Sequence, residues 1–187
     1  MITLQIDYQA IQAAIRTLQK FPGAIKKANK MALGRAMDRM RTTAARAITA
    51  RYYIKMGDVR KSISVKFSGT DASFIVRGAR KSLSYFHMTP KKAPAKNGLR
   101  VAVRKDTGIK RIAKGFIIHG RGSGRALPFI RTGRARGDIK HLISPAIPQT
   151  IEKNEEVQNE IINAGQEAYV KNFEYWASKI TRTGGIK

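Results

Sequence analysis

Three histidines and two aspartates of this 187-residue chain could converge on acid–base or metal chemistry: His87, His119, His141, Asp106 and Asp138. Brought together, imidazole and carboxylate groups can hold a divalent metal and activate water, which is the chemistry of a small nuclease. Their spacing in the sequence matches no metal-ligand motif. The chain has no cysteine, so a disulfide scaffold, a thiolate metal site and a cysteine nucleophile are excluded. The sequence therefore predicts a protein that is not an enzyme and has no cofactor and no bound metal.

The glycine- and arginine-rich segment at residues 120–125 invites comparison with a phosphate-binding loop. It lacks the Gly-Lys-Ser/Thr ending and the helical continuation that this mechanism needs, so we expect no nucleotide site there. Together with the basic, proline-containing stretch at 89–98, the segment is predicted to be an extended loop that is mobile when unbound.

Positive charge is concentrated in one part of the chain. Lys and Arg number 37 against 12 Asp and Glu, which gives a net charge of +25. The excess is +9 over residues 23–62 and +16 over 63–148, but only +1 over 1–22 and −1 over 149–187, where every glutamate lies. Such an excess destabilises a compact chain by self-repulsion, so we expect an anionic partner for the basic part. A solvated basic surface is the plainer alternative.

Helical periodicity dominates the N-terminal third. Residues 2–6 alternate as a short strand, and Asp7 is a candidate cap for a helix that begins at Tyr8 and is ended by Phe21-Pro22-Gly23. Apolar residues at three- or four-residue spacing then predict a long helix over 24–51. A short helix capped by Asp58 is expected after it, before residue 63.

The middle of the chain changes to a period of two, which predicts strands. The expected strands are 64–68, 72–77, 84–88, 99–104, 115–119 and 126–131. The last of them is expected at a sheet edge, because Pro128 cannot donate a hydrogen bond to a ladder. The predicted fold class is α+β, with a mainly antiparallel sheet between a long N-terminal helix and a long C-terminal helix, and with basic extended loops.

The C-terminal part reads as one helix over about 149–180, after a proline-rich connection at 139–148. Tyr169, Phe173 and Trp176 lie on its apolar side. These rings are expected to pack on the rest of the chain, and as the sharper alternative we assign them to an interface with a second subunit.

Length and composition predict a single domain over 1–187, divided into an N-terminal strand and helices (1–62), a basic sheet with loops (63–148) and a C-terminal helix (149–187). No apolar run approaches the roughly 20 residues that cross a bilayer, and the start lacks the features of a signal peptide. We therefore expect a soluble product made in a cytoplasm, with no membrane partner.

Several segments, taken in order, resemble the minor tail protein Z family of long-tailed bacteriophages and prophages, also called tail completion proteins. The similar segments are the run from Ala50 to Ile63, which contains Tyr53-Ile-Lys and Asp58-Val-Arg-Lys, and then 86–92, 101–105, 115–117 and 127–133. The most specific is Ile139-Lys-His-Leu-Ile-Ser-Pro-Ala-Ile-Pro-Gln149, in which Ser144 stands where the family usually has glycine.

The resemblance implies a structural virion protein without catalytic residues, located at the head-proximal end of the tail and made in the host bacterial cytoplasm. It also implies a role in tail maturation, in head–tail joining and in positioning the DNA end. Its implied partners are the tail terminator and the neck or connector proteins. We also expect contact with double-stranded genomic DNA. The chain is further expected to form a ring of identical subunits, with a hexamer favoured.

On this interpretation the basic residues of the middle segment form a surface that faces DNA or an acidic neighbouring protein. They are Lys91, Lys92, Lys96, Arg100, Arg104, Lys105, Lys110, Arg111, Lys114, Arg121 and Arg125. A cellular nucleic-acid-binding protein that contacts phosphates without reading sequence, such as an architectural or ribosome-associated factor, is the alternative function.

Overall fold

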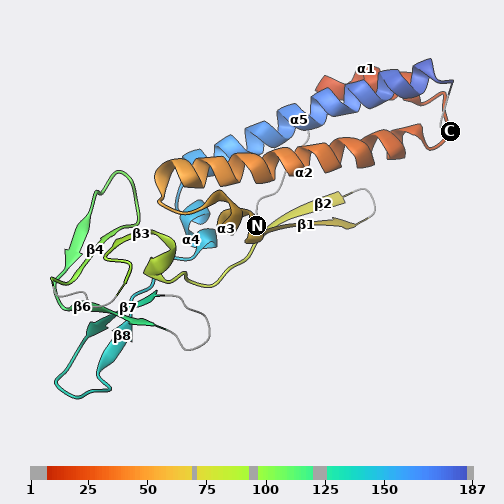
Figure 1. Cartoon of the computed structure of the whole chain (residues 1–187). Helices are drawn as coiled ribbons and strands as arrows, with labels where there is room; N and C mark the ends of the chain where they lie inside the picture. The colour runs from red at the N-terminus through yellow and green to blue at the C-terminus, as the bar shows by residue number, and fades with distance from the viewer. Residues whose placement is uncertain (1–7, 69–70, 93–96, 120–125, 185–187) are drawn as a thin grey trace. The chain divides into compact units, whose positions relative to one another are not determined.

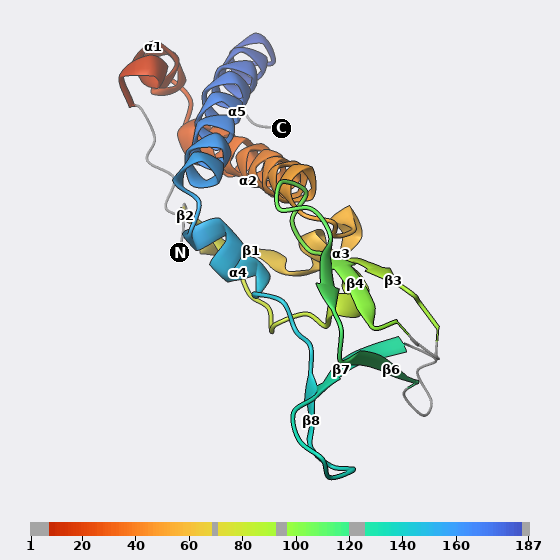
Figure 2. The same ribbon diagram turned by 90° about the vertical axis from the view of Figure 1, so that its left-hand side faces the viewer.

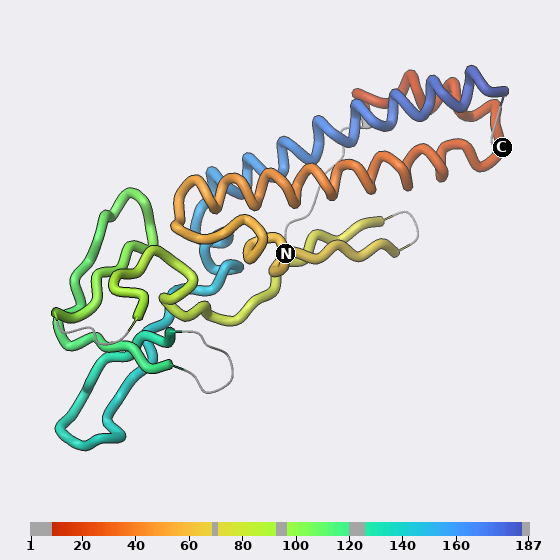
Figure 3. Tube along the Cα trace, in the orientation of Figure 1, coloured from red at the N-terminus to blue at the C-terminus, as the bar shows by residue number. Residues whose placement is uncertain are grey.

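The computed structural model describes residues 8–68, 71–92, 97–119 and 126–184. It is 49% helical and 24% strand, with antiparallel sheets and two long helices, so the predicted α+β class is confirmed (Figure 1). The chain divides into two compact units, each made of segments that are distant in the sequence. Figure 3 traces the path of the chain through them. We describe each unit separately.

Unit 1 (residues 1–45, 63–76 and 154–187) is built on helices. Helix α1 (Tyr8–Leu18) begins at the predicted residue and ends shortly before the Phe21-Pro-Gly segment that was expected to end it. Helix α2 (Ala24–Arg51), the first part of which belongs to unit 1, has the predicted bounds. Helix α1 and this part of α2 run alongside α5 (Glu155–Arg182) (Figure 1). The expected strand at 2–6 and its cap Asp7 lie outside the described residues.

The core of unit 1 combines small residues of α2 with large residues of α5. Ala28, Ala32 and Ala36 are buried against Phe173 and Ile180. Because alanine side chains are short, the two helix backbones can approach closely, and the aromatic rings fill the remaining space. A buried polar link joins the helices: the Tyr169 hydroxyl donates to Asn29 Oδ1 over 2.8 Å.

A two-stranded hairpin completes unit 1. Strand β1 (Ile63–Ser68) pairs antiparallel with β2 (Asp71–Val76). Phe74 and Phe67 lie on the same face, because Phe74 is opposite Val65 and Phe67 is opposite Ala72. Phe74 is buried, whereas Phe67, nearer the turn of the hairpin, remains exposed.

Unit 2 (residues 46–62 and 77–153) contains two three-stranded antiparallel sheets. Helix α3 (Met56–Lys61) leads into the unit; its cap residue is Lys55, and Asp58 lies in the first turn, so the cap predicted at Asp58 was wrong. The expected strand 84–88 is instead a 3-10 turn, η1 (Leu83–Tyr85), followed by β3 (His87–Thr89).

The first sheet of unit 2 has the order β3-β4-β5, with β4 (Leu99–Ala102) in the centre and β5 (Lys110–Ile112) at the edge. Its inner face carries Met88, Leu99 and Val101, which are buried with Leu83 and Ile117. Strand β5 was not predicted, because two of its three residues are charged and give no apolar alternation.

The second sheet has the order β6-β7-β8, formed by β6 (Gly115–His119), β7 (Ala126–Arg131) and β8 (Ile139–His141) (Figure 2). Strand β7 lies in the centre, so the edge position predicted from Pro128 was wrong. Pro128 is tolerated because β8 pairs only with residues 129–131. Beyond that ladder, the Pro128 carbonyl still accepts from the Leu142 N–H over 2.9 Å.

The predicted C-terminal helix is two helices, α4 (Ile147–Glu152) in unit 2 and α5 in unit 1. Pro148 lies in the first turn of α4, where its missing N–H costs nothing. The helix is interrupted between Glu152 and Glu155. Asn154 caps the new helix α5, since its side chain accepts a hydrogen bond from the Val157 N–H over 3.1 Å. Among the described helices, none has a stretch that is both long and apolar enough to cross a membrane.

Candidate polyanion-binding site

The charge of the chain is divided unequally between the units. Unit 2 contains 24 Lys and Arg against 4 Asp and Glu, a net charge of +20, whereas unit 1 contains 13 against 8, a net charge of +5. The basic middle segment recognised in the sequence is therefore mostly unit 2. Any polyanion that this chain attracts is drawn to that unit first.

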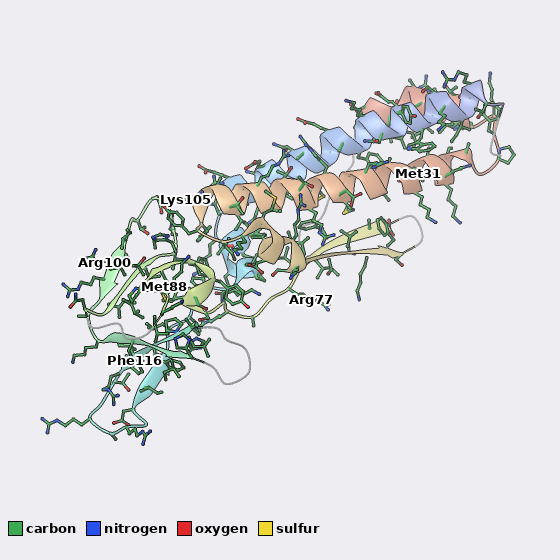
Figure 4. The ribbon with its side chains drawn as sticks, in the orientation of Figure 1. Met31, Arg77, Met88, Arg100, Lys105 and Phe116 are labelled. Atoms are coloured by element: carbon green, nitrogen blue, oxygen red, sulfur yellow. The ribbon has the colours of Figure 1, made fainter. Side chains whose placement is uncertain are left out.

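An arginine pair stands on the outer face of the β3-β4-β5 sheet. Arg100 of β4 lies directly opposite Arg111 of β5 and next to Thr89 of β3, so the three side chains form one row across the sheet. Both arginines are exposed, and Figure 4 shows Arg100 directed away from the unit while Met88 lies within it. Like charges directly opposite each other destabilise a sheet, and in the described part of the chain neither guanidinium forms an ion pair. An anion bound to this row would therefore be held by both guanidinium groups.

Two rings lie on the same face, one row further along. His87 is opposite Ala102, and the Tyr53 ring centroid lies 5.6 Å from the His87 ring at an angle of 43°. The Tyr53 N–H donates to the Val103 carbonyl over 2.9 Å, which fixes this residue at the end of β4. We call Tyr53, His87, Thr89, Arg100 and Arg111 the outer face. Sequence reasoning did not consider Tyr53 as a site residue and assigned His87 only to the hypothetical nuclease site, because the pairing that places both rings beside the arginines is not visible in the sequence.

Arg104, a predicted polyanion-facing residue, already has an anionic partner. Its guanidinium donates to both carboxylate oxygens of Asp106, with a distance of 2.9 Å from Nε to Oδ1. This hydrogen-bonded pair raises the pKa of Arg104 and lowers the pKa of the Asp106 carboxyl below its ordinary value. Asp106 therefore neutralises much of the charge that Arg104 was expected to present.

A second basic area adjoins the β6-β7-β8 sheet. A hollow of about 480 Å³ is lined by Lys114, Phe116, Arg131 and the start of the β7–β8 loop, which includes Arg134. The guanidinium carbon of Arg131 lies 5.6 Å from the Phe116 ring centroid, and Arg131 Nη1 donates to the Ala135 carbonyl over 3.2 Å. These two contacts orient the Arg131 guanidinium, and the side chains of Lys114, Arg131 and Arg134 are all exposed. Of these cations, only Lys114 was predicted from the sequence.

Asp138 organises the loop that carries Arg134. Its Oδ2 accepts from the Ala135 N–H over 3.1 Å, and its carbonyl accepts from the Thr132 N–H over 2.8 Å. Gly133 lies so close that an added Cβ would be 2.2 Å from Asp138 Oδ2. The carboxylate thus has a structural role in shaping this basic loop.

The remaining predicted cations are at the surface or beyond the described chain. Lys91, Lys92, Lys105 and Lys110 are exposed; Lys110 alternates with Arg111 and so lies on the opposite side of β5. Lys96, Arg121 and Arg125 lie outside the described residues.

The five residues of the hypothetical nuclease site have separate surroundings. Asp106 binds Arg104, His87 contacts Tyr53, and Asp138 is part of the β7–β8 loop. His141 Nε2 lies 3.0 Å from Ser82 Oγ, and its ring packs on Phe129. His119 is the last residue of β6 and pairs with Ala126 of β7. Across the described ranges, no three histidine, aspartate or glutamate residues are grouped closely enough to hold a metal.

The aromatic residues assigned to a subunit interface are mostly internal. Tyr169 and Phe173 are 3% and 1% exposed and belong to the core of unit 1. Trp176 is half-buried against that core, with the Lys179 Nζ 4.8 Å from its ring centroid. The first two rings therefore pack within the chain, as the first interpretation expected, and a subunit contact at Trp176 stays a prediction.

Comparisons with protein-family models, with curated proteins and with solved structures found no match for this chain.

Proposed function

We propose that this chain is a non-catalytic structural protein that binds a polyanion through unit 2. The observation that carries the proposal is the exposed Arg100–Arg111 pair. A sheet that places two guanidinium groups opposite each other gives up stability, and a bound anion recovers it by bridging them. The net charge of +20 on the same unit supplies the long-range attraction.

We further propose that the protein acts in the tail of a long-tailed bacteriophage, at the end that meets the head. The support is the ordered resemblance to the minor tail protein Z family, above all the segment from Ile139 to Gln149. A protein beside a DNA channel needs a basic surface but no catalytic residues. It also needs further surfaces that bind neighbouring tail proteins. DNA and an acidic neighbour remain the two candidates for the anion.

The polyanion proposal is tested by neutralising the pair. The variant Arg100→Gln/Arg111→Gln should bind a 30-base-pair duplex more weakly, and the slope of log K against log salt should fall by about two, because each lost phosphate contact removes about one counterion. The matched control is Lys26→Gln/Arg35→Gln, which removes the same charge from exposed positions of unit 1. Equal losses in both variants would contradict a site at the outer face.

The virion assignment is tested on particles of the phage or prophage that encodes the chain. We expect the protein at a low, fixed copy number in purified particles, and density for it at the head–tail junction in a low-resolution map. A protein that is absent from particles and binds nucleic acid tightly as a monomer or dimer would favour the cellular nucleic-acid-binding alternative.

A further inference from the structure

The outer face of the β3-β4-β5 sheet combines two kinds of group that a simple phosphate-binding surface does not need together. Arg100 and Arg111 supply charge, whereas Tyr53 and His87 supply exposed rings. Tyr53 is 41% exposed although its ring is large and mostly apolar. The outer face therefore offers rings for stacking as well as positive charge.

The rows of this face have the spacing of a strand. Thr89 and Arg100 form one row, and His87 and Ala102 form the next, so equivalent side chains lie about 7 Å apart along the strands. Ala102, which lies on the same face opposite His87, is buried, so other side chains cover the sheet at this row. A linear ligand that carries both anionic and planar groups can therefore contact arginine in one row and an aromatic ring in the next.

From this arrangement we infer that the outer face binds unpaired nucleotides, with bases stacked on His87 and Tyr53 and phosphates held by Arg100 and Arg111. Sheet faces that combine aromatic rings with cations recognise single strands in this way, because every base has a π-face to stack. In a duplex the bases are already stacked and only the phosphates remain available. The inference rests on the proposed polyanion binding and specifies its ligand.

The second basic area does not offer the same chemistry. The Phe116 ring is already stacked on Phe129, with centroids 6.2 Å apart, and it lies beneath the Arg131 guanidinium. On the outer face, the Tyr53 ring contacts the Lys105 ammonium as well as His87, and Lys105 Nζ lies 5.7 Å from the Tyr53 ring centroid. Lys105 is exposed, and its flexible stem lets the ammonium exchange the ring for a phosphate.

The test measures binding of the full chain to three fluorescein-labelled probes, namely a 20-nucleotide oligo-dT, a 20-nucleotide oligo-U and a 20-base-pair duplex. Tyr53→Leu and His87→Leu should each weaken binding of a single strand about tenfold and change duplex binding less than twofold, with the salt slope unchanged. Tyr53→Phe keeps the ring and should bind as the wild type does. The comparison of oligo-dT with oligo-U identifies whether DNA or RNA is preferred.

Tyr175→Leu is the matched control, because Tyr175 is an exposed ring of unit 1, and it should alter neither affinity. If the duplex binds as tightly as the single strands and Tyr53→Leu has no effect, the inference is overturned while polyanion binding stands. If Arg100→Gln also leaves all three probes unaffected, the proposed polyanion site fails as well. Thermal unfolding of each variant verifies that the sheet is intact.

Discussion

Arg100 and Arg111 face each other directly across the β4–β5 ladder, and both side chains are exposed. Strand β5 is an edge strand of three residues, so the pair weakens an element that few hydrogen bonds hold. A surface that was selected for stability alone would place an acidic residue at one of the two positions. The pair therefore links the stability of the sheet to its binding of anions.

Replacing one arginine by glutamate should make this link visible. Arg111→Glu converts a repulsive cross-strand pair into an attractive one, and we expect unit 2 to gain about 0.5 kcal/mol, or about 1–2 °C in Tm. The same variant should bind duplex and single-stranded nucleic acid more weakly. Differential scanning calorimetry with and without a 20-nucleotide strand measures both effects. A loss of stability together with unchanged binding would contradict the assigned role of the pair.

The pair of Arg104 with Asp106 predicts an acid titration. The guanidinium stabilises the carboxylate, so Asp106 should titrate by NMR below the ordinary value of about 3.9, and Arg104→Gln should return it toward that value. Because the pKa is lowered in the folded chain, the stabilisation is present above the ordinary value and is lost as the pH falls through the lowered one. A carboxyl that titrates normally in the wild-type chain would exclude the bidentate pair in solution.

Releasing Arg104 should strengthen anion binding. Asp106→Asn leaves the guanidinium without its carboxylate, and we expect tighter binding of a duplex and a salt slope steeper by about one. Asp71→Asn makes the same change of charge in unit 1 and serves as the control. Fluorescence anisotropy at several salt concentrations measures the slope. An equal effect of both variants would mean that only net charge matters.

The helices could be predicted from the sequence because their signals are local. Apolar spacing and terminal residues set the bounds of α1 and α2, and the Phe21-Pro-Gly23 segment separates them. The break at Asn154 was missed, since helical residues continue on both sides of it and only a side-chain cap marks the new start. The short strands β5 and β8 were missed because three residues give no usable period.

The candidate site was predictable in composition but not in arrangement. Net charge pointed to the basic middle of the chain, and Arg100 and Arg111 were both expected at its surface. Their opposition depends on the register of β4 and β5, which is a long-range property of the folded chain. Tyr53 reaches the same face through long-range backbone contacts, namely its own bond to Val103 and the bridge between Tyr52 and Arg104. The Asp106 contact, which removes Arg104 from the available charge, likewise depends on folded geometry.

Substitution of a buried ring of α5 should reduce stability much more than substitution of an exposed ring on the same helix. Phe173→Ala should destabilise the chain by about 3–5 kcal/mol because it leaves a cavity among α1, α2 and α5. Tyr175→Ala, at an exposed neighbouring position, should change stability by less than about 0.5 kcal/mol. Chemical denaturation measures both. A Phe173→Ala chain that keeps its stability but loses self-association would instead support the interface assignment.

The β7–β8 loop offers a matched pair of glycine substitutions. At Gly133 a new Cβ would be 2.2 Å from Asp138 Oδ2 and 2.8 Å from its Cγ, so Gly133→Ala must displace the carboxylate that accepts from the Ala135 N–H. At Gly137, in the same loop, no atom of the described residues lies within 4 Å of the added Cβ. We therefore expect Gly133→Ala to cost about 0.5–1.5 kcal/mol, the range of a lost hydrogen bond, and to release Arg131 from the Ala135 carbonyl. Gly137→Ala should have almost no effect on stability.

Thermal unfolding measures the loss of stability in each variant, and the chemical shift of the Ala135 amide reports the lost hydrogen bond. Identical results for the two variants would show that Asp138 does not organise the loop.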